Sequence, residues 1–250
     1  MYWKMDLFNE NIPPFNFPTD KQGYSLEFNA EFAIYRLTVP NGQLIYAENF
    51  FDKKMSDRSL EYFLENESVD WKNTDWHKFS EEKLSEIRFN NIQWKHDKIK
   101  LYGKEIFIPR LSAWYADANT SYTYSGLTLQ SNPWNSGLLH IKNEIEKISN
   151  VNFNSVLLNW YRDGQDYISW HADAEKGLGQ NPTIASVNFG ETRRFLLRRI
   201  DDHSIKLEFP LKHGTLLIMS GELQHFWQHN VPKQKKVKNS RINLTFRKII

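Results

Sequence analysis

The sequence predicts a mainly β fold, a double-stranded β-helix or jelly roll, with helices flanking it on the N-terminal side. From about residue 152 onward, short runs rich in β-branched and aromatic residues are separated by Gly, Pro, Asn and Asp. Eight such runs suit a double-sheet jelly roll. Ahead of them, two stretches repeat apolar residues at helical spacing. The expected strands are 155–161, 166–171, 183–189, 194–198, 205–209, 215–219, 225–229 and 241–247.

The first expected helix covers residues 57–66. Leu60, Phe63 and Leu64 have the i, i+3, i+4 spacing of a buried face, and Ser56 is a candidate N-cap. Residues 9–24, ahead of this helix, contain three prolines among Asn and Phe residues. We expect that stretch to lie on the surface without regular structure.

The second expected helix is the clearest in the chain. Pro133 lies near its first turn and Asn150 can close its C-terminal end. Its apolar face is formed by residues that recur at intervals of three and four: Leu138, Ile141, Ile145 and Ile148.

The composition excludes several classes of site. The chain has no cysteine, which excludes disulfides, zinc knuckles, iron–sulfur clusters and thiol nucleophiles. Any metal must therefore be held by His and carboxylate side chains. No run of about 18 apolar residues predicts a membrane span, and the N-terminus lacks the apolar region of a secretory signal. We expect an intracellular protein, cytoplasmic in a bacterium or nuclear in a eukaryote.

The charge pattern permits a polyanionic partner. The net charge is +2, and the basic residues gather toward the C-terminal half. The densest group is a lysine run over residues 233–238. Such runs are usually solvated loops, so the pattern alone leaves both readings open.

A candidate metal site begins with His171 and Asp173. In an extended strand, residues two apart point to the same face, so the imidazole and the carboxylate can converge. Two His and one carboxylate leave coordination positions open, as non-haem Fe(II) requires when it binds a co-substrate and dioxygen. A His-x-Asp pair also occurs by chance in many proteins, and a second His must come from elsewhere.

The last expected strand, residues 241–247, alternates strictly between polar and apolar residues. Arg241, Asn243, Thr245 and Arg247 share one face. This face can be the solvated side of an edge strand. It can also be a pocket wall in which an arginine grips a dicarboxylate.

A second strand offers similar polar groups. Asn159 and Tyr161 lie on one face of residues 155–161 and could donate hydrogen bonds to the same ligand. Asn and Tyr in a strand are more often structural, so this pattern also has two readings.

Six motifs together resemble the AlkB family of Fe(II)/2-oxoglutarate dioxygenases. They appear in the family's order and at plausible spacings, most clearly over residues 152–250 and more loosely back to about residue 44. We therefore treat 1–43 as an N-terminal extension and 44–250 as the catalytic domain, with its core at about 152–250. The motifs are Asn159–Gly164, His171–Glu175, Ile184–Gly190, His213–Met219, His229–Pro232 and Arg241–Arg247.

The resemblance implies an iron site and a co-substrate site. By similarity, His171, Asp173 and His229 would be the iron ligands. His225 competes with His229 because it lies four residues earlier. Arg241 would pair with the distal carboxylate of 2-oxoglutarate, and Arg247 would complete the pocket. Further hydrogen bonds to 2-oxoglutarate would come from Asn159, Tyr161, Asn243 and Thr245.

The resemblance also implies an oxidative demethylase that repairs 1-methyladenine and 3-methylcytosine type lesions in DNA. The products would be formaldehyde, succinate and carbon dioxide. Such an enzyme must flip the base out of a duplex and stack it between flat side chains. Within the family, the chain looks most like the members that act on double-stranded DNA.

Candidate substrate-binding residues follow from the same resemblance. Tyr122, Thr123, Tyr124 and Ser125 resemble the base-sandwiching strand, although two tyrosines at this spacing are also ordinary strand packing. A duplex-wedging hairpin would carry Tyr102, Gly103 and Lys104, and Arg110 would lie near the same groove. Ala174 and Glu175 follow the expected metal ligands, and Lys233, Lys235 and Lys236 could contact phosphates.

One departure from the family pattern affects this reading. Many relatives carry an acidic residue directly after the iron-binding Asp, where this chain has Ala174. This puts the contacts to the base edge, and hence the lesion preference, in doubt. Asn188, where Ser is common, and Tyr102 look like mild substitutions.

The alternatives are an Fe(II)/2-oxoglutarate hydroxylase that acts on RNA or protein, and a non-catalytic module that binds alkylated bases. We expect DNA as the partner, with RNA as the alternative, no membrane association and a monomeric protein.

Overall fold

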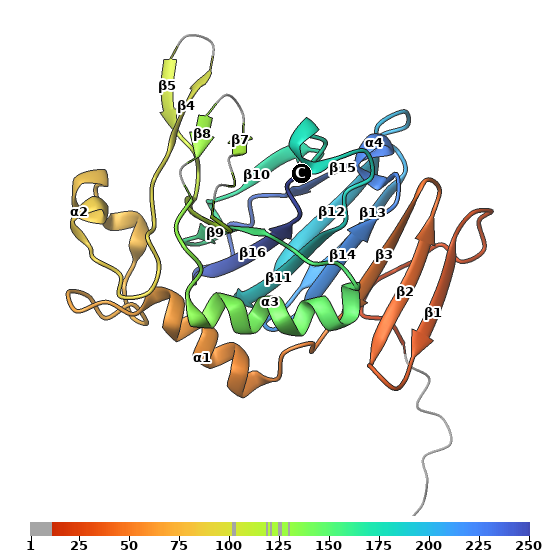
Figure 1. The fold of residues 1–250 in the computed structure, drawn as a ribbon, viewed down its shortest axis with the longest axis horizontal. Coiled ribbons are helices and arrows are strands. Elements are labelled where there is room, and N and C mark those ends of the chain that lie inside the picture. Colours follow the sequence, from red (N-terminus) through yellow and green to blue (C-terminus); the bar gives the residue numbers. More distant parts are fainter. Residues whose placement is uncertain (1–11, 102–103, 119, 121, 125–126, 130) are drawn as a thin grey trace, which may run out of the picture.

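The protein is built on two antiparallel sheets that face each other (Figure 1). The computed structural model describes residues 12–101, 104–118, 120, 122–124, 127–129 and 131–250. The eight-stranded major sheet has the order β1-β2-β3-β14-β11-β16-β9-β6. Its strands are β1 (Ser25–Asn29), β2 (Ile34–Val39), β3 (Gly42–Ala47), β6 (Leu111–Ala116), β9 (Ser155–Tyr161), β11 (Ile184–Gly190), β14 (Leu216–Ser220) and β16 (Arg241–Arg247).

The minor sheet has four strands in the order β10-β15-β12-β13. These are β10 (Ile168–His171), β12 (Arg193–Arg199), β13 (Lys206–Leu211) and β15 (Trp227–Val231). A cluster of buried side chains that includes Tyr161, Leu197, Leu217 and Trp227 joins the two sheets. The arrangement confirms the predicted jelly roll.

The expected strand at residues 225–229 was wrong in its position. Residues Leu223–Phe226 form a short helix, α4, and β15 begins only at Trp227. Gly221, with φ of 70°, turns the chain at the end of β14, and Leu223 and Gln224 then point into the protein. This turn places Gln224 where it contacts the metal-site region, as described below.

The N-terminal strands β1, β2 and β3 form a meander at one edge of the major sheet (Figure 1). Strands β1 and β2 lie within the segment that we expected to be an extension. Alternating apolar residues of β2 are buried against the core between the sheets. A tight turn joins β2 to β3, and Asn41 adopts the left-handed conformation there, with φ of 64°.

Two helices cover the outer face of the major sheet: α1 (Lys53–Leu64) and α3 (Ser136–Ser149). Asp52 caps α1, because its carboxylate accepts the Met55 N–H at 2.7 Å. The prediction of Ser56 as the cap was wrong: Ser56 lies inside the helix and its hydroxyl donates to the Phe51 carbonyl. Asn150 ends α3 in the left-handed conformation, as expected.

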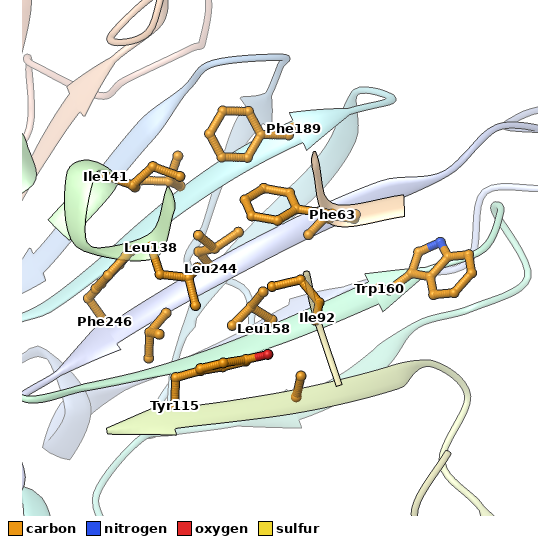
Figure 2. Close-up of a cluster of buried hydrophobic side chains, with 14 of the residues drawn as sticks. Phe63, Ile92, Tyr115, Leu138, Ile141, Leu158, Trp160, Phe189, Leu244 and Phe246 are labelled. Atoms are coloured by element: carbon orange, nitrogen blue, oxygen red, sulfur yellow. The ribbon is translucent and has the colours of Figure 1, made fainter. Parts of the chain in front are cut away.

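The core beneath these helices explains how the site is positioned. Leu158 and Trp160 of β9, with Leu244 and Phe246 of β16, point toward α1 and α3 (Figure 2). They pack with helix and loop residues that include Phe63, Ile92, Leu138 and Ile141. Because side chains alternate along a strand, the polar residues of β9 and β16 must face the other sheet. Burial of each large apolar side chain contributes about 1.5–3 kcal/mol, so this packing fixes the strand register.

Smaller elements surround one end of the molecule. Two hairpins project there, β4 (Lys98–Leu101) with β5 (Lys104–Phe107) and β7 (Tyr122–Tyr124) with β8 (Leu127–Leu129) (Figure 1). The remaining helical turns are η1 (Trp76–Lys78), α2 (Glu81–Glu86) and η2 (Lys176–Leu178). Within the described ranges, no helix has the length and apolar character needed to cross a membrane.

Candidate metal and co-substrate site

His171 and His229 face each other across the minor sheet. Strands β10 and β15 pair so that His171 lies directly opposite His229, and the two ring centroids are 4.2 Å apart. The Phe195 ring stacks on the other side of His229 at 5.3 Å. The His171 Nδ1 lies 2.8 Å from the Ser169 carbonyl, so an Nδ1–H donor there leaves the Nε2 lone pair for a metal.

Asp173 completes this group. Potential ligand atoms of His171, Asp173 and His229 lie within 4.8 Å of one another. The Asp173 carboxylate is 1% exposed, and its Oδ2 accepts a hydrogen bond from Arg247 Nη2 at 2.9 Å. The backbone N–H of Asp173 donates to Gln224 Oε1 at 2.9 Å. Arg247 therefore holds the carboxylate of Asp173, and Gln224 holds its backbone.

The electrostatics give the group the protonation states that a metal needs. Burial, together with the neighbouring His171, lowers the pKa of His229 to about 3, so His229 is neutral near pH 7. Burial by itself would raise the pKa of Asp173, but the Arg247 guanidinium and then the two imidazoles hold it below its ordinary value. Imidazoles and a carboxylate are the donors of a facial-triad iron site.

The polar face of β16 forms one wall of the cavity beside these ligands. Strand β16 lies inside the major sheet, between β11 and β9, and the side chains of its polar face are buried and not solvated. Arg241, Asn243, Thr245 and Arg247 all line the cavity, which is shared with His171, Asp173 and His229. Of the two readings of this strand, the pocket wall is the one that matches its position.

Arg241 is a buried cation that lacks a carboxylate counter-ion among the residues described. Its side chain is 1% exposed, and its guanidinium lies 4.9 Å from the centre of the Tyr161 ring. Burial lowers the pKa of Arg241 to about 10, so the guanidinium still carries its charge at neutral pH. Its Nη2 donates to Asn188 Oδ1, whereas Nε and Nη1 find no acceptor in the described part of the chain. These two nitrogens can take an anionic ligand.

The other candidate co-substrate residues lie along the same cavity. Asn159 and Tyr161 of β9 line it. Asn159 Oδ1 accepts a hydrogen bond from Arg110 Nε at 2.7 Å. Asn243 Nδ2 donates to Ser186 Oγ at 2.7 Å, and Asn243 Oδ1 accepts from Thr245. These side chains hold one another in place along the cavity wall.

The cavity fits a ferrous ion and a dicarboxylate. Asp173 Oδ1 and His229 Nδ1 are buried and have no hydrogen-bond partner among the described residues. Unpaired buried polar atoms are costly, so they point to a ligand that satisfies them. Fe(II) suits the His, Asp, His donor set, and the charge on Arg241 suits a carboxylate at the far end of the cavity.

His225 lies away from this group. It is the last-turn histidine of α4, its side chain is exposed, and its Nε2 faces the Gln180 carbonyl and Asn181 Oδ1. The structure therefore brings His229, and not His225, to His171 and Asp173.

The candidate substrate-binding residues are placed in part. Tyr122, Thr123 and Tyr124 form β7, while Tyr102, Gly103 and Ser125 lie outside the described residues. Lys104 begins β5 and is exposed, as are Ala174 and the loop residues Lys233, Lys235 and Lys236. Glu175 is half-buried, and its Oε2 lacks a hydrogen-bond partner within the described ranges. Arg110 lies deeper than we expected, because it lines the cavity next to Asn159.

Sequence reasoning missed two residues that support the site. Gln224 and Asn188 are buried and hold Asp173 and Arg241 respectively. Asn188 stands out in the sequence as a departure from Ser, but nothing in its local pattern links it to Arg241. Gln224 falls in a stretch that we expected to lead directly into a strand.

Comparisons with known proteins agree with this geometry. The model of the 2OG-Fe(II) oxygenase superfamily matches residues 43–247. The Bos taurus protein named "Alpha-ketoglutarate-dependent dioxygenase alkB homolog 3" is 46% identical over 150 residues, which are 56% of this chain and 52% of that protein. The chain thus spans about half the length of that relative.

Two further relatives carry the name "DNA oxidative demethylase ALKBH2". The Homo sapiens protein is 40% identical over 160 residues, which are 61% of each chain. The Mus musculus protein is 39% identical over 160 residues, which are 61% of this chain and 67% of that protein.

Proposed function

Because this chain belongs to the 2OG-Fe(II) oxygenase superfamily, and within it to the AlkB family, we propose that it removes alkyl groups from damaged DNA bases by oxidation. The observation that carries the proposal is one cavity that joins His171, Asp173 and His229 to the buried Arg241. The names of the relatives favour DNA as the substrate. We propose 1-methyladenine and 3-methylcytosine type lesions as the targets.

Different residues of the cavity would bind the iron and the 2-oxoglutarate. His171, Asp173 and His229 would hold the iron. Arg241 would pair with the distal carboxylate of 2-oxoglutarate, because its Nε and Nη1 lack acceptors among the described residues. Tyr161, Asn159, Asn243 and Thr245 line the space between these two ends, and Arg247 keeps Asp173 ionised and oriented.

When bound, Fe(II), 2-oxoglutarate and dioxygen together supply the oxidant that hydroxylates the alkyl carbon, with succinate and carbon dioxide as co-products. The protein's own task is to orient that carbon and to exclude water. Apolar side chains close the cavity around the polar groups, namely Leu157, Ile168, Phe195, Met219 and Val231. The hydroxymethyl group that forms on the base then leaves as formaldehyde.

A damaged base must leave the helix to reach this cavity, because a base within a duplex cannot approach a buried metal. We propose that Tyr122 and Tyr124 of β7 stack on one side of the flipped base and that His171 lies on the other. Glu175 lies two residues after the metal ligand Asp173, and its unsatisfied Oε2 supports a contact to the base edge. Thr123, Ser125 and Ala174 would complete this surface.

Contacts to the rest of the DNA come from two segments in this proposal. Tyr102, Gly103 and Lys104 follow β4 in the sequence, with Lys104 as the first residue of β5, and would wedge into the gap left by the base. Lys233, Lys235 and Lys236 are exposed in the loop between β15 and β16 and would contact phosphates, and Arg110 would lie at the base of the groove. We propose that the protein is a monomer and that it acts in the bacterial cytoplasm or the eukaryotic nucleus.

The experiment that tests this function is an anaerobic reconstitution with Fe(II) and 2-oxoglutarate. Oxygen is then added together with a methylated oligonucleotide, and the amounts of formaldehyde, succinate and restored base are quantified. Single-stranded DNA, duplex DNA and RNA of the same sequence are compared. His171→Ala is the control for turnover.

The proposal expects equal amounts of formaldehyde and restored base on DNA, and none with His171→Ala. Release of formaldehyde from RNA alone would replace DNA by RNA as the substrate. Tight binding of methylated DNA without succinate would instead identify a non-catalytic binding module and overturn the enzymatic assignment.

A further inference from the structure

We propose that Asn188 is a positioning residue for the co-substrate: its neutral oxygen orients the Arg241 guanidinium while leaving the charge of that guanidinium for a carboxylate ligand. The inference deepens the proposed function, since it rests on a dicarboxylate 2-oxo acid occupying the cavity. Asn188 does not line the cavity, so it would act only through Arg241.

The position of Asn188 is fixed by the sheet. It lies on β11, opposite Asn243 of the neighbouring β16, and its side chain is 1% exposed. Its backbone N–H donates to the Thr215 carbonyl at 3.0 Å, and its own carbonyl accepts from the Gly214 N–H at 2.8 Å. The side-chain oxygen thus lies at a defined point behind the cavity wall.

The side-chain oxygen of Asn188 contacts two residues of the cavity wall, Arg241 and Asn243. Asn188 Oδ1 accepts a hydrogen bond from Arg241 Nη2 and a longer one, at 3.3 Å, from Asn243 Nδ2. On its other side, Arg241 lies against the Tyr161 ring. The ring and the amide oxygen together fix the plane of the guanidinium, which leaves Nε and Nη1 for the ligand.

The neutrality of the amide sets Arg241 apart from two other buried arginines, Arg162 and Arg247, which have carboxylate partners. Arg162 donates to both carboxylate oxygens of Asp166, and Arg247 is paired with Asp173. Arg241 receives only an amide oxygen from Asn188, so its charge is not cancelled. A carboxylate at position 188 would form an internal ion pair and compete with the ligand's carboxylate for the same cation.

The test compares Asn188→Asp with Asn188→Ala. Aspartate has nearly the shape of asparagine, so Asn188→Asp changes charge while conserving size. It should raise the melting temperature of the ligand-free protein, because a buried cation gains a counter-ion. The same change should weaken 2-oxoglutarate binding by about a hundredfold, whereas Asn188→Ala should lower stability and weaken binding by about tenfold.

Binding is measured by calorimetry under nitrogen on Mn(II)-loaded protein, so no turnover is involved. The second ligand is 2-oxopentanoate, which has the same five-carbon chain but no distal carboxylate. Asn188→Asp should leave its affinity within about twofold, since it makes no ion pair with Arg241. The matched control, Asn239→Asp, adds the same charge at an exposed position two residues before Arg241 and should leave both affinities unchanged.

Equal losses for both ligands, or a lowered melting temperature with Asn188→Asp, would mean that Asn188 only maintains the fold, and the proposal would be overturned. Unchanged 2-oxoglutarate affinity in Asn188→Asp would overturn it as well. Neither result depends on DNA, so failure of this inference is distinguishable from failure of the proposed repair activity.

Discussion

Replacing Arg247 by methionine should destabilise the metal-free protein by about 3–5 kcal/mol, the usual cost of breaking a buried ion pair. Arg247 Nη2 lies 2.9 Å from Asp173 Oδ2, and both side chains are buried. His229 cannot take over the role of the cation at neutral pH, because burial lowers its pKa to about 3. Methionine fills part of the space of the arginine stem but leaves the carboxylate without the guanidinium.

For a chain of this size, each kcal/mol corresponds to roughly 2–4 °C in melting temperature, so the expected decrease is roughly 6–20 °C. The control is Arg194→Met, which breaks the Arg194–Glu208 pair on the minor sheet. That pair is about half exposed, so its loss should cost at most about 1 kcal/mol. Both variants are compared by calorimetry, without metal and with Mn(II).

Bound Mn(II) should reduce the loss of stability in Arg247→Met, because the metal supplies a positive charge next to Asp173 in place of the missing guanidinium. It should leave the difference between Arg194→Met and the wild type unchanged. If Arg247→Met proves no more damaging than Arg194→Met, or if Mn(II) restores none of the lost stability, the electrostatic account of the ligand group is wrong.

Three further predictions concern separate parts of the protein. Because the pKa of His229 is lowered in the folded state from an ordinary value near 6.5, only the unfolded chain takes up this proton as the pH falls. The metal-free protein should therefore lose about 2 kcal/mol of stability between about pH 6.5 and 4.5 in urea titrations, and His229→Gln should flatten this slope. Gln224→Leu should lower metal affinity by about tenfold in a Mn(II) titration, because it removes the acceptor of the Asp173 N–H. Gln228→Leu, which alters only the partner of Arg198, should leave that affinity unchanged. Tyr102→Ala should reduce repair of duplex DNA more than repair of single strands; equal losses would remove the wedge assignment.

The sequence predicted those parts of the site that depend on alternation within one strand. Residues 241–247 alternate between apolar and polar side chains, and the structure places the two sets on opposite faces of β16. The sequence could not decide whether the polar face was solvated, because that depends on the neighbours of the strand. Strand β16 lies between β11 and β9, and residues of the facing minor sheet close over its polar face, which therefore becomes a cavity wall.

Features that depend on distant contacts were not predictable from local patterns. The choice between His225 and His229 rests on the register that sets His229 opposite His171. The cap of α1 at Asp52, and not Ser56, depends on where the preceding chain turns. Asn188 and Gln224 support the site from strands and turns far away in sequence, so no spacing rule identifies them.

The most direct test of the central claim is a crystal structure grown without oxygen in the presence of Mn(II) and 2-oxoglutarate, with anomalous diffraction to locate the metal. The account predicts one metal peak bounded by His171, Asp173 and His229, with the distal carboxylate of the ligand against Arg241. A metal bound elsewhere, or a ligand whose distal carboxylate lies away from Arg241, would contradict it.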